Sequence, residues 1–173
     1  MINKRIILVS KAGGGKDFFR GYLSKFEKLD VSYTTRPSRT GEKEGYTYNY
    51  ISEFDFISKN NKNYFLEAVN FNGWWYGTSV SNWATKNIFI MTPPGLLTVP
   101  KEDLQDSIIV YLDIPIEVRR ERLNKRSDAD SVDRRILADE KDFLNFELFD
   151  IRVTNPLFNP ELLYKIILDY SKI

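Results

Sequence analysis

The feature that most constrains the fold of this chain is a short apolar segment that runs into three consecutive glycines and a lysine. Residues 6–9 read Ile-Ile-Leu-Val, Gly13 to Gly15 and Lys16 follow, and apolar residues recur at helical spacing after Asp17. Glycines let successive backbone N–H groups converge on an anion, and a helix N-terminus adds partial positive charge. The segment therefore predicts a phosphate-binding strand, loop and helix.

The loop departs at both ends from the P-loop pattern Gly-x-x-x-x-Gly-Lys-Ser/Thr. Gly15 and Lys16 match it, whereas Ser10 replaces the first glycine and Asp17 replaces the hydroxyl residue. A glycine-rich turn that only joins strand to helix stays open as an alternative, and Asp17 has the alternative of a helix-capping carboxylate. The functional interpretation is that Lys16 binds the outer phosphates and Asp17 contacts Mg²⁺.

The composition limits the chemistry that the chain can perform. Its 173 residues include no cysteine and no histidine, which excludes disulfides, thiol nucleophiles, imidazole bases and Cys/His zinc sites. Carboxylates, lysines, arginines, hydroxyls and tyrosines remain, and these suit catalysis by positioning and electrostatics. A net charge of +1 predicts no nucleic-acid partner. Because no apolar run reaches about 18 residues, we expect no membrane partner and a cytoplasmic location.

Short apolar segments alternate with helical patterns through most of the chain. Strands are predicted at residues 5–9, 87–91, 107–112 and 150–154, and helices after Asp17, after Pro115, around residues 132–143 and after Pro160. Such alternation implies crossover connections and a mainly parallel sheet that is covered on both faces. The predicted class is therefore α/β.

Residues 33–82 break this alternation. They are rich in aromatic and polar residues, and Asn72-Gly73 separates the apolar runs 65–71 and 74–78, which is a strong hairpin signal. We therefore predict a core formed by residues 1–32 and 83–173, interrupted by a small β-rich insertion at residues 33–82.

The insertion opens with a block that combines arginines, hydroxyls and tyrosines, from Ser32 to Tyr48. Two guanidinium groups with hydroxyl donors are what a phosphomonoester requires, although a solvated loop with scattered arginines is the alternative. The block resembles the nucleotide-binding segment of guanylate kinases, which follows the pattern Ser-x-Thr-Thr-Arg-x-x-Arg-x-Gly-Glu-x-x-Gly-x-x-Tyr. Further on, Glu67 and the segment 72–78, Asn-Gly-Trp-Trp-Tyr-Gly-Thr, are similar to that family's Glu…Gly-Asn-Tyr-Tyr-Gly-Thr/Ser segment.

This resemblance implies a three-layer P-loop kinase core with a parallel sheet, a nucleoside monophosphate (NMP)-binding subdomain at residues 33–82 and a short helical lid at about residues 122–135. It also implies an acceptor site. Glu67 would accept hydrogen bonds from guanine, Tyr76 would contact the phosphate, and Thr78 would contact the base. The full set of implied NMP-binding residues is Ser32, Arg36, Arg39, Tyr48, Glu67, Tyr76 and Thr78.

Arginines follow in the region of the implied lid. Arg119, Arg122 and Arg126 share one helix face, for which a solvated face paired with Glu117 and Glu121 is the alternative. The resemblance implies phosphoryl-transfer roles for some of them. Its implied catalytic set is Lys16, Arg36, Arg122, Arg126 and Arg135. Its implied ATP-binding set is Ala12, Gly13, Gly14, Gly15, Lys16, Asp17 and Asn155, the last of which has a turn before proline as its alternative.

One segment departs from the family pattern. Guanylate kinases usually carry Asp-x-Asp-x-x-Gly after the third core strand, whereas residues 90–95 here read Ile-Met-Thr-Pro-Pro-Gly. One of the missing acids normally helps to recognise the guanine amine and the pair supports the metal site, so base selectivity is in doubt. We hypothesise that Asp17 replaces the metal-supporting carboxylate.

The leading prediction is a nucleoside monophosphate kinase that transfers a phosphoryl group from ATP, with Mg²⁺, to GMP or dGMP, acting as a monomer or homodimer. Lid closure would exclude water while the two phosphates are aligned. Two alternatives stay open. One is a kinase of the same fold for another (deoxy)nucleotide or a sugar phosphate, and the other is a non-catalytic module that binds phosphopeptides.

Overall fold

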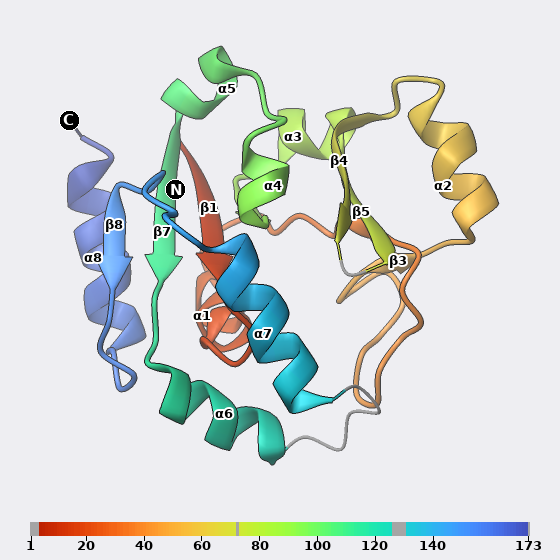
Figure 1. Ribbon diagram of the computed structural model, residues 1–173. Helices are drawn as coiled ribbons and strands as arrows, with labels where there is room; N and C mark the ends of the chain where they lie inside the picture. The colour runs from red at the N-terminus through yellow and green to blue at the C-terminus, as the bar shows by residue number, and fades with distance from the viewer. Residues whose placement is uncertain (1–3, 72, 126–130, 173) are drawn as a thin grey trace.

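The computed structural model describes residues 4–71, 73–125 and 131–172. Its core is a parallel four-stranded sheet in the order β6-β1-β7-β8 (Figure 1). The strands are β1 (Arg5–Ser10), β6 (Ile88–Ile90), β7 (Ser107–Leu112) and β8 (Ile151–Val153). β1 is an interior strand, so the glycine loop that follows it lies at the carboxyl edge of the sheet, where ligands of such sheets bind.

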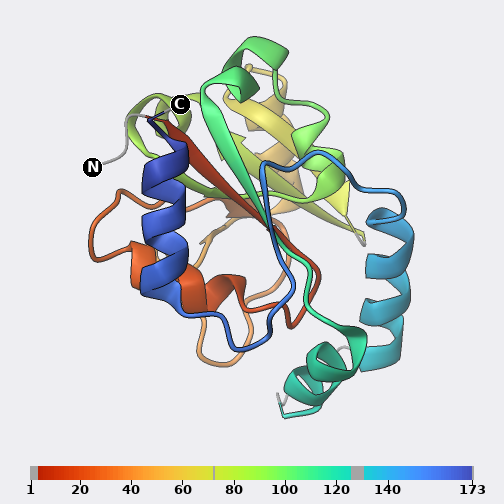
Figure 2. The ribbon, with the colours of Figure 1, turned by 90° about the vertical axis from the view of Figure 1, so that its left-hand side faces the viewer.

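Helices cover both faces of this sheet and form the outer layers of a three-layer core (Figure 2). Ile6 and Leu8 pack with α1 (Lys16–Leu23) and α8 (Pro160–Tyr170). Ile7 and Val9 lie on the other face, in a cluster that α3 (Val80–Thr85) and α4 (Pro93–Leu96) complete. Because successive strand residues point to opposite faces, a strand that is apolar at every position must be buried on both sides. The predicted α/β class is confirmed.

Three more helices complete the core: α5 (Lys101–Gln105) leads into β7 at the amino edge of the sheet, whereas α6 (Ile116–Asn124) and α7 (Val132–Asp142) belong to the connection that leaves β7 at the carboxyl edge. α6 and α7 flank residues 126–130, and α7 passes in front of the loop after β1 in Figure 1. Within the described parts of the chain, no helix has the length and apolar character that crossing a membrane requires.

A second, mixed sheet lies beside the core, in the order β3-β2-β5-β4. It contains β2 (Tyr33–Thr34), β3 (Asn49–Tyr50), β4 (Phe65–Phe71) and β5 (Trp74–Ser79). The predicted hairpin is confirmed as the antiparallel pair β4–β5, although Asn72 of its turn lies outside the described residues. The pair places Glu67 opposite Thr78 and Val69 opposite Tyr76.

Three local features differ from the sequence prediction. Apolar residues recur at helical spacing from Phe18 to Leu29 and predict a longer first helix, but α1 ends at Leu23, where the Phe26 and Glu27 amides both donate to the Leu23 carbonyl. The Pro93-Pro94-Gly95 segment has the composition of a turn that closes the strand at 87–91, but it begins α4, because the Thr92 hydroxyl accepts the Gly95 amide as a helix cap. The insertion also contains α2 (Glu53–Asn60), capped by Ser52, which we did not predict.

Candidate nucleotide-binding site

The glycine loop is tightly enclosed by its surroundings. Gly13 and Gly15 have φ of +76° and +94°, a region that side-chain-bearing residues rarely adopt. A Cβ atom at Gly13 would lie 2.8 Å from the Arg119 carbonyl oxygen, and one at Gly14 would lie 2.0 Å from Ser10 Oγ. Gly13 and Gly15 are therefore required by their backbone conformation, and a side chain at residue 14 would have to displace the Ser10 hydroxyl, along a path that leads directly into the N-terminus of α1 at Lys16.

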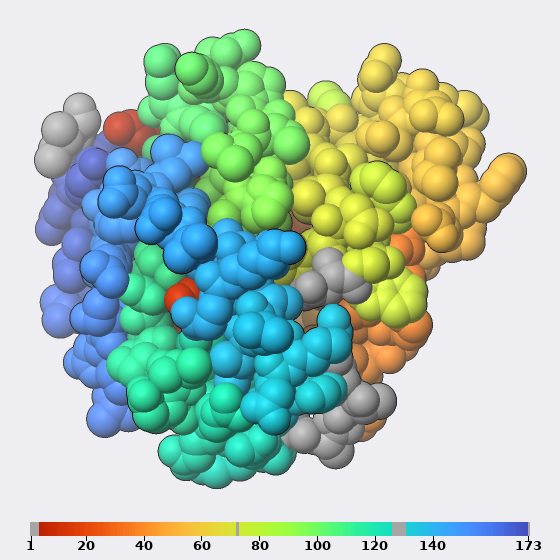
Figure 3. All heavy atoms as spheres, in the orientation of Figure 1, coloured from red at the N-terminus to blue at the C-terminus, as the bar shows by residue number. Residues whose placement is uncertain are grey.

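A cavity of about 660 Å³ separates the loop from the second sheet. Figure 3 shows the blue and green core segments on one side of the molecule and the yellow and orange segments of the second sheet on the other. The structure brings most of the predicted site residues to the walls of this cavity: Ala12, Lys16, Asp17, Ser32, Arg36, Arg39, Tyr48, Glu67, Tyr76 and Arg135. Residues of the glycine loop and of the arginine block therefore face one space.

The arginine block is organised by Glu42, which sequence reasoning did not select. Arg36 is buried and donates to both Glu42 oxygens at 2.9 and 3.0 Å. Glu42 also accepts from the Arg39 amide at 2.8 Å and the Tyr50 hydroxyl at 2.7 Å. Burial alone would raise the pKa of Glu42, but these bonds lower it. The glutamate therefore stays ionised and holds the Arg36 guanidinium, which lies 5.5 Å from the Tyr48 ring centre, in place.

Glu67 is a buried carboxylate on the cavity wall, with 4% of its surface exposed. Its Oε2 accepts the Thr78 amide at 3.1 Å, across the β4–β5 pair. Burial raises the pKa of Glu67 to about 7, although the bonds to Thr78 act in the opposite direction. A buried carboxylate that is short of cationic partners is well suited to receive N–H donors from a ligand.

Gly95, at the start of α4, shapes the position of Glu67. A Cβ atom at residue 95 would lie 2.6 Å from Glu67 Oε1, which is closer than real contacts allow. In the sequence Gly95 falls on the glycine of the Asp-x-Asp-x-x-Gly pattern, but that pattern gives no sign of a contact with Glu67. The glycine is needed because β4 and α4 approach closely behind the carboxylate.

If Glu67 binds guanine as the family resemblance implies, we predict that Gly95→Ala weakens GMP binding about tenfold, because Glu67 must shift by a few tenths of an ångström or more from its place on the wall. Isothermal titration with GMP measures the effect, and ADP affinity serves as the internal control. Gly21→Ala is the matched control, since a Cβ atom there meets nothing within 4 Å. Unchanged GMP affinity in Gly95→Ala would contradict this role.

Several predicted residues are not among those that line the cavity: Gly13, Gly14, Gly15, Thr78, Arg122 and Asn155. Arg122 donates to the Gly13 carbonyl at 3.1 Å and to the Pro156 carbonyl at 2.7 Å, so it ties the glycine loop to the segment after β8. Asn155 Oδ1 accepts the Leu157 amide at 2.9 Å and forms a turn. Thr78 is buried beside Glu67. Arg126 lies outside the described residues.

Two charged residues beneath the loop were also missed. Arg119, which the spacing placed on a helix face with Arg122, is 1% exposed, and Asp139 of α7 contacts the loop backbone. A buried arginine gives no recognisable signal in an amphipathic pattern, because the residue type predicts exposure. The pairing of Arg119 with Asp139 joins two different helices and becomes apparent only in the structure.

A parallel sheet whose interior strand leads through a glycine loop and a lysine into a helix, with a second sheet across a cavity, is the P-loop kinase fold. The guanylate kinase family model matches residues 2–163 of the chain. The chain therefore belongs to the guanylate kinase family.

Individual relatives agree with this assignment. The chain is 33% identical over 168 residues to guanylate kinase of Legionella pneumophila (strain Lens), with 88% of this chain and 78% of that protein covered. It is 31% identical over 170 residues to guanylate kinase of Methylobacillus flagellatus, with 90% and 83% covered. The crystal structure of guanylate kinase from Anaplasma phagocytophilum superposes with a TM-score of 0.73 at 18% identity, covers 99% of this chain and 85% of that one, and supports the fold.

Proposed function

We propose that the protein transfers the γ-phosphoryl group of ATP to GMP or dGMP. The observation that carries this proposal is that residues at both ends of the glycine loop (Ala12, Lys16 and Asp17) line one cavity with the acceptor-site side chains Arg36, Arg39, Tyr48 and Glu67. Such a cavity suits two nucleotides whose phosphates meet between the loop and the arginine block. Catalysis then consists of alignment and charge neutralisation, without a covalent enzyme intermediate.

In this proposal the two halves of the molecule hold different substrates. Residues 1–32 and 83–173 form the core that holds ATP on the loop amides and Lys16, and residues 33–82 hold the acceptor. Arg135 reaches the cavity from α7, where positive charge stabilises the transferring phosphoryl group. Arg122 supports the Gly13 carbonyl, and Arg126 has the role that the family resemblance implies.

Asp17 is the proposed residue for Mg²⁺. Its side chain is exposed in the first turn of α1 and lines the cavity beside Lys16. A single carboxylate with phosphate oxygens and water is a common set of Mg²⁺ ligands. No group of three or more acidic, histidine or cysteine residues suited to a metal occurs in residues 4–71, 73–125 or 131–172, which is consistent with a metal that the nucleotide itself largely holds.

We predict that Asp17→Ala increases the Mg²⁺ concentration needed for half-maximal turnover by about tenfold or more, because one hard oxygen ligand is lost. A Mg²⁺ titration at saturating ATP and GMP measures it. Asp55→Ala in α2 removes an acid remote from the cavity walls and serves as the control. An unchanged Mg²⁺ titration in Asp17→Ala would remove Asp17 from the metal site.

An ADP-release assay with GMP, dGMP, AMP, dTMP and dCMP tests the function as a whole. We expect turnover with GMP and dGMP and at least about 100-fold lower kcat/KM with the other acceptors, because only guanine offers adjacent N–H donors to Glu67. Preference for another acceptor would indicate a kinase of different specificity. No turnover with any of them would reject the proposal.

A further inference from the structure

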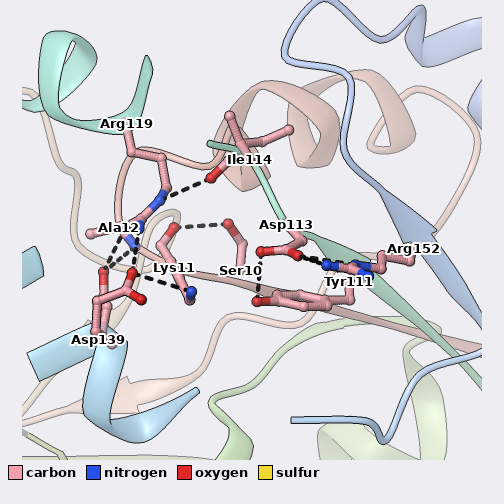
Figure 4. A network of polar contacts seen from close by, with 10 residues as sticks. Ser10, Lys11, Ala12, Tyr111, Asp113, Ile114, Arg119, Asp139 and Arg152 are labelled. Atoms are coloured by element: carbon pink, nitrogen blue, oxygen red, sulfur yellow. Dashed lines mark hydrogen bonds and ion pairs between the residues drawn. The ribbon is translucent and has the colours of Figure 1, made fainter. Parts of the chain in front are cut away.

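A buried charged network lies directly beneath the glycine loop (Figure 4). Its centre is Arg119 of α6, whose Nε donates to the Ile114 carbonyl at 3.0 Å and whose Nη2 donates to Glu140 at 2.7 Å. Its Nη1 lies 3.6 Å from Asp139 Oδ2 and makes no hydrogen bond to any residue that the structure describes. Asp139 and Glu140 are consecutive residues of α7.

The same two carboxylates hold two consecutive residues of the loop. Asp139 Oδ2 accepts the Ala12 backbone N–H at 2.7 Å, and Glu140 Oε1 lies 3.2 Å from Lys11 Nζ. Figure 4 shows Asp139 pointing from α7 toward both Ala12 and Arg119. Two side chains of α7, the helix that follows the implied lid segment, therefore contact the loop: one binds the loop backbone and the other binds a loop side chain.

The bond to Ala12 distinguishes Asp139 from a residue that only neutralises Arg119. A buried ion pair is weak evidence for stability, because desolvation of the two charges offsets their attraction. A backbone N–H that is shielded from water, by contrast, requires an acceptor, and a carboxylate makes a short and strong one. The Asp139 side chain is 7% exposed, so water has little access to this bond.

The bond from Ala12 to Asp139 also lies next to a loop residue with a restricted backbone conformation. Gly13, the residue after Ala12, has φ of +76°, and its carbonyl accepts from Arg122. Asp139 fixes the N–H on one side of this residue and Arg122 fixes the carbonyl on the other. Asp139 shares the cavity wall with Lys16 and Arg135. Burial raises the pKa of Asp139, and the bond from the Ala12 amide and the positive charges of Lys16, Arg119 and Arg135 offset part of that rise.

We propose that Asp139 is a positioning residue of the phosphate loop: by holding the Ala12 N–H from α7, it sets the loop conformation that binds the phosphates of the donor nucleotide. This inference rests on the proposed function, because it takes the loop as the donor site. It assigns to α7 a second role beside that of Arg135, namely support of the loop backbone.

Calorimetric titrations with ADP and with GMP test the proposal on three variants. We expect Asp139→Ala to weaken ADP binding about tenfold, the effect of losing one charge-assisted hydrogen bond, and to leave GMP affinity unchanged. Asp139→Asn keeps an oxygen that accepts the Ala12 N–H, so its ADP affinity stays within about threefold of the wild type. The paired variant Arg119→Met/Asp139→Ala removes both buried charges and leaves the Ala12 N–H without its acceptor.

The paired variant separates positioning from stability. Asp139→Ala alone leaves buried Arg119 with Glu140 but without Asp139, which lowers the Tm, and the paired variant recovers most of that loss. ADP binding stays weak in the paired variant if Asp139 positions the loop. Recovery of ADP affinity together with the Tm would overturn the proposal, and so would wild-type ADP affinity in Asp139→Ala. If the paired variant does not fold, equal weakening by Asp139→Asn and Asp139→Ala overturns it.

The proposed function fails by a different result. A wild-type protein that binds neither ADP nor GMP and releases no ADP in the acceptor assay would reject the kinase proposal before any variant is compared. Wild-type turnover with unaltered ADP binding in Asp139→Ala would reject only the positioning role.

Discussion

Replacing Lys16 by alanine is expected to lower kcat by about 10²–10³-fold while the fold stays intact. Lys16 is the first residue of α1 and lines the cavity beside the glycine loop. Its ammonium group is placed to neutralise the outer phosphates of the donor, where charge matters most during transfer. Alanine has the highest helix propensity, so the substitution does not weaken α1.

The measurement is steady-state ADP release at saturating ATP and GMP, with Tm determined in parallel. Lys62→Ala is the matched control, because Lys62 is exposed, follows α2 and is absent from the cavity wall. We expect the control to retain wild-type kcat. If Lys16→Ala keeps its kcat, the loop binds phosphate without contributing to transfer, and the proposed donor site is wrong.

The second large effect is expected at Glu67. Glu67→Gln keeps the volume and one acceptor oxygen but replaces the other oxygen with an N–H₂ donor. Guanine presents N–H donors from N1 and from its amine. In the variant, the side-chain N–H₂ group of the introduced glutamine faces one of these donors, and the two cannot form a hydrogen bond. Loss of one charge-assisted bond and creation of this clash are expected to lower kcat/KM for GMP about 100-fold or more.

The KM for ATP is the internal control in this experiment, because Glu67 lies on β4, in the sheet across the cavity from the loop. An equal rise of both KM values would indicate general disruption of the site. Equal kcat/KM for GMP in Glu67→Gln and wild type would show that guanine is recognised elsewhere.

The same substitution predicts a dependence of stability on pH. Burial raises the pKa of Glu67 to about 7 in the folded protein, above the value of 4.5 for an ordinary glutamate. Because the folded state holds this proton more tightly, the stabilisation from protonated Glu67 is complete below about pH 4.5 and is lost as the pH rises through about 7. Glu67→Gln has no such loss, so its Tm advantage over the wild type should grow between pH 5 and pH 8.

Ionisation of Glu67 lowers the stability of the fold but is expected to favour the proposed activity. The ionised form of Glu67 accepts two N–H donors, whereas the protonated form accepts less well, so kcat/KM for GMP should rise with pH through about 7 in the wild type. A buried carboxylate that lowers stability at neutral pH is typical of a ligand-binding site, because packing of the core does not require it. A Tm difference that is independent of pH would contradict this account.

Much of the fold was predictable because its signals are local. The apolar strand 5–9 and the hairpin around Gly73 follow from side-chain period and turn chemistry, and the structure confirms both. The Ser32–Tyr48 block and Glu67 were recognisable from their resemblance to the motifs of guanylate kinases. α2 was missed because its helical pattern is short and lies within a β-rich segment, where capping by Ser52 decides the outcome.

The sequence alone determined that this protein has a phosphate loop, an arginine block and the ordered motifs of the guanylate kinase family, because each is written in consecutive residues. Only the tertiary structure decided that Gly95 backs Glu67, that Glu42 holds Arg36 and that Asp139 holds the Ala12 amide. The last of these contacts joins residues 127 positions apart. Such pairs depend on how packed elements bring distant atoms together, and the spacing of residues along the chain does not specify that.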